Sequence, residues 1–269
     1  MVWFPTVDWF EQFKRALNRN PKFAELDRGW GVGWNGDMIL HLTDVPIDRY
    51  RLNDLPSELI VLDRMPQDIW DDIPDETERR MRNEHGGEPV HRVFSQLDDE
   101  ILSSLPPYVV DLLRDTEALF EDDPTYEDVP DVMSSDIRQV LPDHLEDLLQ
   151  QMEDFVDEER NVYAFMSIRD GEVLEIDILD SPHERDAGFL LRGSYWHWEK
   201  FVEGVDVVEA VLRGELDPVG DMTRLLSYTD ALQEMGDTAA AIETDYLFRA
   251  PEHGDEEQDL ADRAFAEEA

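Results

Sequence analysis

The chain has 269 residues and a formal net charge of −43, because 23 Lys and Arg stand against 66 Asp and Glu. Nucleic acids require a basic protein surface and anionic bilayers repel an acidic one, so neither is an expected partner. The chain contains no cysteine, which excludes disulfides, thiolate nucleophiles and cysteine-bound metal sites. Its hydrophobic content of 41% is sufficient for a folded core, as one large domain or two small ones.

The charge also indicates the solvent in which this protein works. Only three of the 23 basic residues are lysine, and the acids are spread through apolar, patterned segments. The Debye length is about 3 Å at 1 M salt and about 8 Å at 0.15 M, so neighbouring carboxylates repel each other far less in molar salt. The composition resembles that of proteins from salt-accumulating halophiles, and an acidic regulatory protein with flexible tails is the alternative. Without a secretory pattern or a long apolar run, we expect a cytoplasmic protein with no stable membrane insertion.

Two helices are predicted at the start of the chain. Asp8 and Glu11 have the spacing of a capping box, and the aromatic and aliphatic residues that follow share one helical face. Asn20 and Pro21 then have the pattern of an N-cap and a first helical position, which predicts a short second helix.

The segment 28–43 has the strongest local pattern of the chain. Glycine alternates with Trp or Val over 29–34, and 37–42 follows as the returning strand after Asn35-Gly36, the dipeptide that most favours a two-residue hairpin turn. This register predicts that Gly31 lies opposite Leu40. Residues 31–36 also match G-x-G-x-x-G, but a dinucleotide site needs a helix after these glycines, and here a strand is expected to follow.

Residues 45–160 are acidic, interrupted by proline and mostly helical in period, with a loop expected over 121–131. Sheet character returns at Asn161, where Asp170-Gly171 predicts a second hairpin with Tyr163, Phe165, Leu174, Ile176 and Ile178 on one face. The elements expected after it are a strand over 187–192, a helix from Ser194 to Gly204, a short helix from Asp206 to Gly214, an extended piece over 215–219, and helices over 221–235 and 238–247 that Gly236 separates.

No motif in the chain indicates catalysis, a metal or a cofactor. The seven histidines include no H-x-x-x-H pair, and the E-x-x-H match at Glu88–His91 falls in a segment where glycine and proline oppose a helix. There is no calcium-binding loop, P-loop or G-x-S-x-G motif. We therefore expect a protein that is not an enzyme and has no catalytic or metal-binding residues.

Three short motifs follow one another after Tyr195. They are Trp198-Glu199-Lys200-Phe201-Val202-Glu203-Gly204, Ala210-Val211-Leu212-Arg213-Gly214-Glu215-Leu216, and Gly220-Asp221-Met222 leading into Leu225-Leu226. In this stretch the chain resembles the sterol carrier protein family of lipid-binding domains. The motifs cover about a quarter of the chain, and the order of the other elements is compatible over about half of it. Pro218 stands where the family continues a strand, and the segment 45–160 has no counterpart.

The resemblance implies an α/β (α+β) fold in which a mixed, mostly antiparallel sheet is covered by helices, with an apolar tunnel between sheet and C-terminal helices. Residues 1–44 and 161–249 would form this domain, 45–160 an acidic helical insertion, and 250–269 an acidic disordered tail. The implied function is non-catalytic binding or transfer of a lipid-like small molecule. The expected ligand-binding residues are Met38, Leu40, Phe165, Ile176, Phe189, Leu191, Met222, Leu225 and Leu226.

Two other functions remain open at this point. The segment 45–160 could bind a protein partner, in which case the protein is an adaptor without a small-molecule ligand. An enzyme that uses a carboxylate in the cavity is the third hypothesis, ranked last because 66 acids produce carboxylate pairs by chance. The apolar residues named above could equally pack as a dry core.

Overall fold

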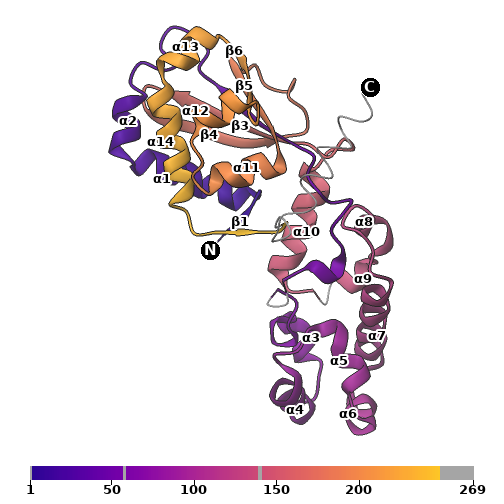
Figure 1. Cartoon of the computed structure of the whole chain (residues 1–269). Helices are drawn as coiled ribbons and strands as arrows, with labels where there is room; N and C mark the ends of the chain where they lie inside the picture. The colour runs from indigo at the N-terminus through magenta and orange to yellow at the C-terminus, as the bar shows by residue number, and fades with distance from the viewer. Residues whose placement is uncertain (1, 57–58, 139–140, 249–269) are drawn as a thin grey trace, which may run out of the picture.

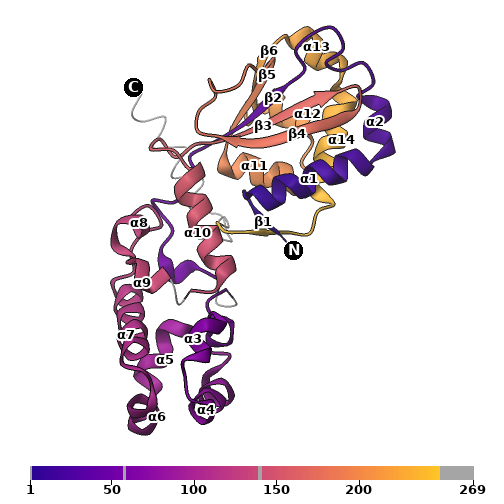
Figure 2. The same cartoon turned by 180° about the vertical axis from the view of Figure 1, so that it is seen from behind.

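The computed structural model describes residues 2–56, 59–138 and 141–248, and the tail predicted over 250–269 lies outside these ranges. The chain forms a sheet lobe (2–44 and 161–248) and a helical lobe (45–160). They lie at opposite ends of the molecule in Figure 1 and, seen from behind, in Figure 2. The sheet lobe confirms the predicted fold class, because a mixed sheet of five strands is covered by helices. The strands are β1 Val2–Phe4, β2 Met38–Thr43, β3 Val162–Arg169, β4 Glu172–Leu179, β5 Phe189–Ser194, β6 Asp217–Gly220 and β7 Thr244–Tyr246.

The five-stranded sheet has the order β4-β3-β2-β5-β6. β2 and β5 are parallel, and the other three neighbouring pairs are antiparallel. A separate parallel pair joins β1 to β7 and so ties the two ends of the described chain together. The covering helices are α1 Val7–Arg19, α2 Pro21–Leu26, α11 Tyr195–Val202, α12 Val207–Arg213, α13 Met222–Ser227 and α14 Thr229–Ala240.

The first two helices lie where the sequence predicts them, with one difference at the start. Thr6, not Asp8, is the N-cap of α1, and its side chain accepts a hydrogen bond from the backbone N–H of Trp9. Asn20 caps α2 as predicted, since its side-chain oxygen accepts from the N–H groups of Lys22 and Phe23. The predicted apolar face of α1 is buried under the sheet.

The hairpin predicted over 28–43 is wrong. Residues 29–34 form turns with φ of +90°, +68° and +81° at Gly29, Gly31 and Gly33, and β2 pairs with β3 and β5 instead. Gly31 therefore lies far from its predicted place opposite Leu40, and a Cβ there would stand 2.7 Å from the carbonyl oxygen of Ile168. The glycines allow the chain to turn tightly with positive φ at the end of the sheet. β2 pairs along its length with two strands in this arrangement, and in the predicted hairpin it would pair with one short strand.

The second hairpin forms at the predicted dipeptide, where Asp170 and Gly171 have φ of 51° and 84°. An irregularity between Ser167 and Ile168 then shifts the register of β3 on β4 by one residue. A shift of one residue moves every side chain beyond it to the other face of a sheet. The predicted grouping on one face is consequently wrong, because Tyr163 and Phe165 lie on one face of the sheet and Ile176 and Ile178 on the other.

The register past this irregularity sets the two faces. Phe165 pairs with Asp177 and Met166 with Ile176, so Ile176 shares the helix-covered face and Phe165 points to the opposite one. Phe165 joins a small cluster of buried residues on that second face, made of Ile39, Tyr163, Phe165 and Leu179.

The predicted break at Gly236 is also wrong. α14 runs through Gly236, and the chain turns only after Ala240 to form β7. A Cβ on Gly236 would lie 3.1 Å from Val207 Cγ2, so the glycine allows α12 to approach α14 closely. The helix predicted over 221–235 is instead divided at Tyr228 into α13 and α14.

The helical lobe is helical as predicted, in short pieces. These are η1 Leu52–Asp54, η3 Leu62–Arg64, α3 Gln67–Asp71, α4 Asp75–His85, α5 Val90–Val93, η4 Phe94–Gln96, α6 Asp99–Ser104, α7 Pro107–Asp122, α8 Val129–Val132, α9 Ser135–Arg138 and α10 Asp143–Phe155. Among the residues that the structure describes, no helix combines the length and the apolar character needed to cross a membrane.

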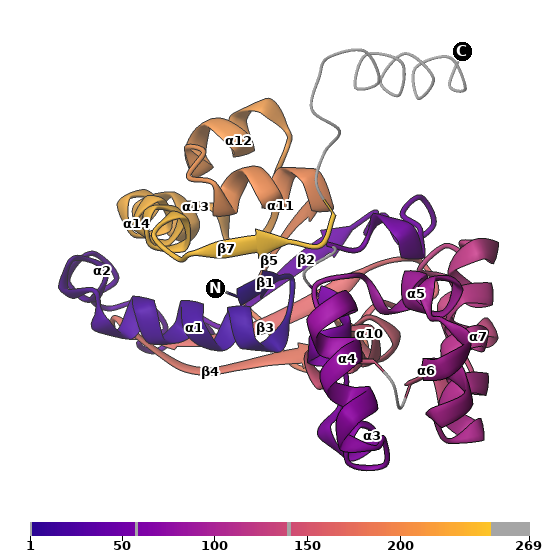
Figure 3. The same ribbon diagram turned by 90° about the horizontal axis from the view of Figure 1, so that it is seen from below.

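The buried side chains do not divide at the ends of the helical lobe. Residues from 62–113 form a core of their own, whereas those from 45–60 and 119–149 belong to the same cluster as the sheet lobe. α10 lies next to the sheet lobe in Figures 1 and 3, and the Gln151 side chain accepts a hydrogen bond of 2.9 Å from the Val7 backbone N–H. The inner half of the helical lobe is therefore continuous with the sheet lobe.

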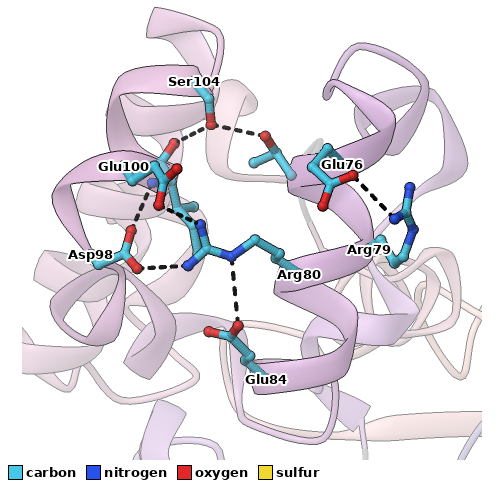
Figure 4. Close-up of polar contacts among 9 residues, drawn as sticks. Glu76, Arg79, Arg80, Glu84, Asp98, Glu100 and Ser104 are labelled. Carbon is cyan, nitrogen blue, oxygen red and sulfur yellow. Dashed lines mark hydrogen bonds and ion pairs between the residues drawn. The ribbon is translucent and has the colours of Figure 1, made fainter.

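Arg80 joins two helices of the outer half (Figure 4). Its guanidinium lies 2.7 Å from Asp98 and 3.0 Å from Glu100, both at the start of α6, and 3.6 Å from Glu84 on its own helix α4. A second link is the 2.9 Å hydrogen bond between the hydroxyls of Thr77 and Ser104. One cation thus links three carboxylates at the tip of the lobe.

Candidate ligand-binding site

Five of the nine predicted ligand-binding residues share the helix-covered face of the sheet: Met38, Leu40, Ile176, Phe189 and Leu191. Leu225 of α13 belongs to the same core and is 6% exposed. The other three lie elsewhere. Met222 and Leu226 are 37% and 62% exposed, and Phe165 is on the opposite face, where the guanidinium of Arg185 lies 5.4 Å from its ring.

The space above this face is occupied by side chains of the protein. The Trp30 ring lies 5.0 Å from Phe189 and 5.1 Å from Tyr228, and its indole N–H donates to the Gly36 carbonyl at 2.6 Å. Met38 is 1% exposed within this core. Neither of the cavities described below reaches the predicted tunnel, which stays a prediction.

The larger cavity has a volume of about 360 Å³ and lies in the inner half of the helical lobe. We name it the junction cavity. Its walls come from α8 and the loop before it, from α10 and the turn after it, and from Ile47. Its apolar side chains are those of Ile47, Val129, Leu149, Met152 and Val156, with Pro130 at the exposed end.

A second cavity of about 10 Å³ shares Met152 and Val156 with the junction cavity. Val162 of β3 and Leu247 also line it, so this second cavity borders the sheet lobe. Its volume is about that of one water-sized probe, which is too small for an organic ligand.

Backbone hydrogen bonds hold the walls of the junction cavity. The Glu127 N–H donates to the Ile47 carbonyl at 3.1 Å, and the Tyr126 N–H donates to the Tyr50 carbonyl at 3.0 Å, which fixes the loop before α8 to the segment 45–50. On the other wall, the Asp157 N–H donates to the Asn161 carbonyl at 3.0 Å. The cavity is thus bounded by ordered backbone on both sides.

Acidic side chains gather at this cavity. Glu127, Glu153, Asp157 and Glu158 line it, and Glu153 forms an ion pair with Arg138. Partial burial opposes the ionisation of Asp157, but hydrogen bonds from Asn161, Tyr163 and Glu159 outweigh it and hold the pKa of that carboxyl below its usual range. Asp157 is therefore a fixed negative charge at neutral pH.

Tyr126 is the aromatic residue of the lining, and its side chain is 4% exposed. Its hydroxyl has no hydrogen-bond partner in the described structure. Burial, with Asp54 nearby, raises the pKa of this phenol above its ordinary value, so it stays protonated.

Asp157 also connects the cavity to the outer face of the sheet. The Tyr163 hydroxyl donates to its carboxylate at 3.1 Å, and so does the Asn161 amide, whose oxygen lies 3.2 Å from Nε2 of His41. Burial lowers the pKa of His41, which is therefore neutral at pH 7. Among the described residues, no three His, Asp or Glu side chains are placed to hold a metal ion.

The sequence reasoning missed this site, although part of its signal was present. The helical period of residues 45–160 predicted the helix that carries Leu149 and Met152, but periodicity alone does not tell which part of a helix face packs and which part remains open. Tyr126 and Glu127 fall in the predicted loop, and no local pattern places that loop against Ile47.

No family model matches the chain, and no curated protein matches it in sequence. Two solved structures are similar to it in shape. Sterol carrier protein 2 is 12% identical with a TM-score of 0.41, over 88% of this chain and 97% of that one. A conserved hypothetical protein from Thermus thermophilus, itself suggested to be a sterol carrier protein, is 21% identical with a TM-score of 0.29, over 33% of this chain and 65% of that one. Both TM-scores are below 0.5, so the proposals below rest on the geometry of this chain.

Proposed function

We propose that this protein binds an apolar or amphipathic small molecule in the junction cavity, without covalent conversion, and carries it in a salt-rich cytoplasm. A single observation supports this function above the others: a cavity of about 360 Å³ that combines an apolar wall with a polar, exposed end. Binding sites for small molecules have about 300–1,000 Å³ and this same mixture of many apolar and few polar groups. An acyl or isoprenoid chain fits such a wall.

The tunnel between sheet and helices remains a second proposed place for the same ligand. It requires α13 to move, because Leu225 and Met38 now fill that space with their own side chains. The exposed Leu226 and Met222 on α13 are compatible with such a movement, since few contacts hold this short helix from outside.

The affinity for a neutral chain tests the function. Burial of each CH₂ contributes about 0.8 kcal/mol, so the dissociation constants of octanol, decanol and dodecanol are expected to fall about fourfold for each added CH₂ until the cavity is full. Isothermal titration calorimetry in 2 M KCl measures this, with circular dichroism to verify the fold.

Three variants locate the site. Met152→Trp fills the junction cavity and is expected to abolish binding, whereas Leu226→Trp adds the same ring on the exposed side of α13 and leaves binding unchanged. Loss of binding in Leu225→Trp but not in Met152→Trp would place the ligand beneath α13, because the larger ring would occupy the space that the ligand needs. Absence of saturable binding to folded wild-type protein would overturn the proposed function.

A further inference from the structure

The junction cavity has a marked charge asymmetry. Among the eleven described residues that line it, four are acidic and none is basic. Arg138 neutralises Glu153, which leaves Glu127, Asp157 and Glu158 around the exposed end of an apolar wall. An anionic head group at that end would be repelled by these three carboxylates, whereas a cationic head group would be attracted by them.

The nearest basic residue along the chain is already engaged. Arg160 follows the turn after α10, and its guanidinium lies 2.5 Å from the carboxylate of Asp48. Its backbone has φ of +62°, and its N–H donates to the Asp157 carbonyl at 2.8 Å, which closes the turn. Arg160 therefore does not line the cavity.

The carboxylate of Asp157 is held in place rather than free to turn away. It accepts hydrogen bonds from the backbone N–H groups of Glu159 at 2.9 Å and Asn161 at 2.8 Å, and from the Tyr163 hydroxyl at 3.1 Å. A carboxylate fixed in this way presents its charge without an ordering cost when a ligand arrives. Tyr126 adds an aromatic ring to the same lining, and aromatic rings attract quaternary ammonium groups.

We propose that the junction cavity selects a cationic amphiphile, in which an alkyl or isoprenoid chain lies along α10 and a primary or quaternary ammonium head lies between Glu127, Asp157 and Glu158. This inference rests on the proposed function and names the class of ligand. It excludes fatty acids and phospholipids with a net negative head as the preferred ligands.

The competing explanation is attraction of any cation to a protein of net charge −43. Two features of the experiment separate the explanations. Titrations in 2 M KCl reduce the Debye length below ~3 Å, so only charges in near contact act. Decyltrimethylammonium, decanol and decanoate share one chain length and differ in head-group charge, and each is used below its micelle-forming concentration.

The expected result is that decyltrimethylammonium binds at least tenfold more tightly than decanol, and decanoate more weakly than decanol. In Glu127→Gln/Glu158→Gln the cation is expected to bind no more tightly than decanol, while the affinity for decanol itself is unchanged. The matched control is Asp115→Asn/Glu172→Gln, which removes two exposed carboxylates outside the cavity and is expected to keep the preference.

Each other outcome has a defined meaning. Equal loss of the preference in both double variants would assign it to the charge of the whole protein and overturn the inference. Binding of decanol without any preference for the cation would overturn the inference and leave the proposed function intact. Absence of binding by all three probes would overturn both.

Discussion

The sheet lobe and the helical lobe are built by different means. Four of the six helices described in the sheet lobe are capped by side chains that accept backbone hydrogen bonds, at Thr6, Asn20, Asp206 and Asp221, whereas α11 and α14 are not. In the helical lobe, proline without a side-chain cap precedes the helices α3, α4, α5, α7 and α10, at Pro66, Pro74, Pro89, Pro106 and Pro142. Proline disfavours the helical conformation in the residue before it, so each of these helices begins only after the proline. Proline also reduces the number of conformations of the unfolded chain, which lowers the entropy cost of ordering the helix start.

The two lobes also differ in charge. Residues 45–160 contain 10 Arg, no Lys and 33 Asp and Glu, a net charge of −23, whereas residues 1–44 and 161–248 contain 11 basic and 25 acidic residues, a net charge of −14. The outer half of the helical lobe has in addition a small separate core. The helical lobe therefore combines a smaller core with stronger repulsion between its carboxylates. Its stability is expected to depend more on salt than that of the sheet lobe.

The largest effect that tests this comparison is expected from withdrawal of salt. When KCl is lowered from 2 M to 0.1 M, residues 62–113 are expected to lose hydrogen-exchange protection before the sheet lobe does, because screening of the denser charge is removed. Hydrogen exchange resolved by peptide measures this, and near-UV circular dichroism reports the packing of the sheet lobe. Simultaneous loss of protection in both lobes would contradict the comparison, and unchanged protection in both would contradict the halophile interpretation.

A smaller effect is expected from one tryptophan in each lobe. The Trp198 indole N–H donates to the His41 carbonyl at 3.0 Å, whereas the buried Trp70 indole N–H has no partner in the described structure. Trp198→Phe removes this hydrogen bond and part of a buried ring and is expected to lower the free energy of unfolding by about 1–3 kcal/mol, whereas Trp70→Phe loses no hydrogen bond and is expected to lower it by less than about 1.5 kcal/mol. Thermal or chemical denaturation in 2 M KCl measures both. A larger loss for Trp70→Phe would show that its contact with Arg82, 4.0 Å from the ring, outweighs the unpaired donor.

A third difference is expected in pH dependence, through one buried carboxyl of the sheet lobe and one exposed carboxyl of the helical lobe. Burial raises the pKa of Asp27 in the sheet lobe to about 7, so the folded state is penalised as pH rises from about 4 to 7 and the penalty is complete above pH 7. Hydrogen bonds from the Ile101 N–H and from Arg80 lower the pKa of Asp98 in the helical lobe, so its contribution is lost as pH falls below about 4. The contributions of these two groups are thus expected to respond to acid in opposite directions.

Asparagine variants isolate these two groups. Asp27→Asn keeps an oxygen that can accept from the Gly171 N–H at 3.1 Å, so it is expected to raise the free energy of unfolding at pH 8 by ~1–3 kcal/mol and to flatten the profile between pH 4 and 7. Asp98→Asn is expected to lower stability at pH 8 and to have little effect at pH 3. Denaturation midpoints across pH 3–8 in 2 M KCl measure both, and an Asp27→Asn profile as steep as that of the wild type would show that another group titrates.

Local patterns predicted most of the helices and one hairpin correctly. Asn20-Pro21, Asp206 with Gly214, and Asp170-Gly171 act through a few neighbouring residues, and the structure places a cap, a helix end or a turn at each of them. The segment before β2 shows the limit of this reasoning. Asn35-Gly36 has an equally strong local preference, but β2 gains two long neighbours by pairing with β3 and β5 instead.

The candidate site was much less predictable than the fold. Phe165 and Ile176 lie on opposite faces because of one irregularity in the pairing of β3 with β4, and Leu226 lies on the exposed side of a helix that begins at the predicted motif. The junction cavity unites Ile47, Tyr126 and Met152, which are separated by long stretches of chain. Nothing in the local pattern of any one of these residues indicates the other two.

By itself, the sequence determined the large excess of negative charge, the absence of cysteine chemistry, the alternation of helices and strands, and the caps that start many of these elements. Such properties depend on composition or on residues within about four positions of one another. Only the tertiary structure decided which strands pair, which face Phe165 and Ile176 occupy, and where the apolar wall of α10 is left unfilled. Those outcomes follow from competition between long-range contacts, in which a shift of one residue or the packing of one distant loop changes the result.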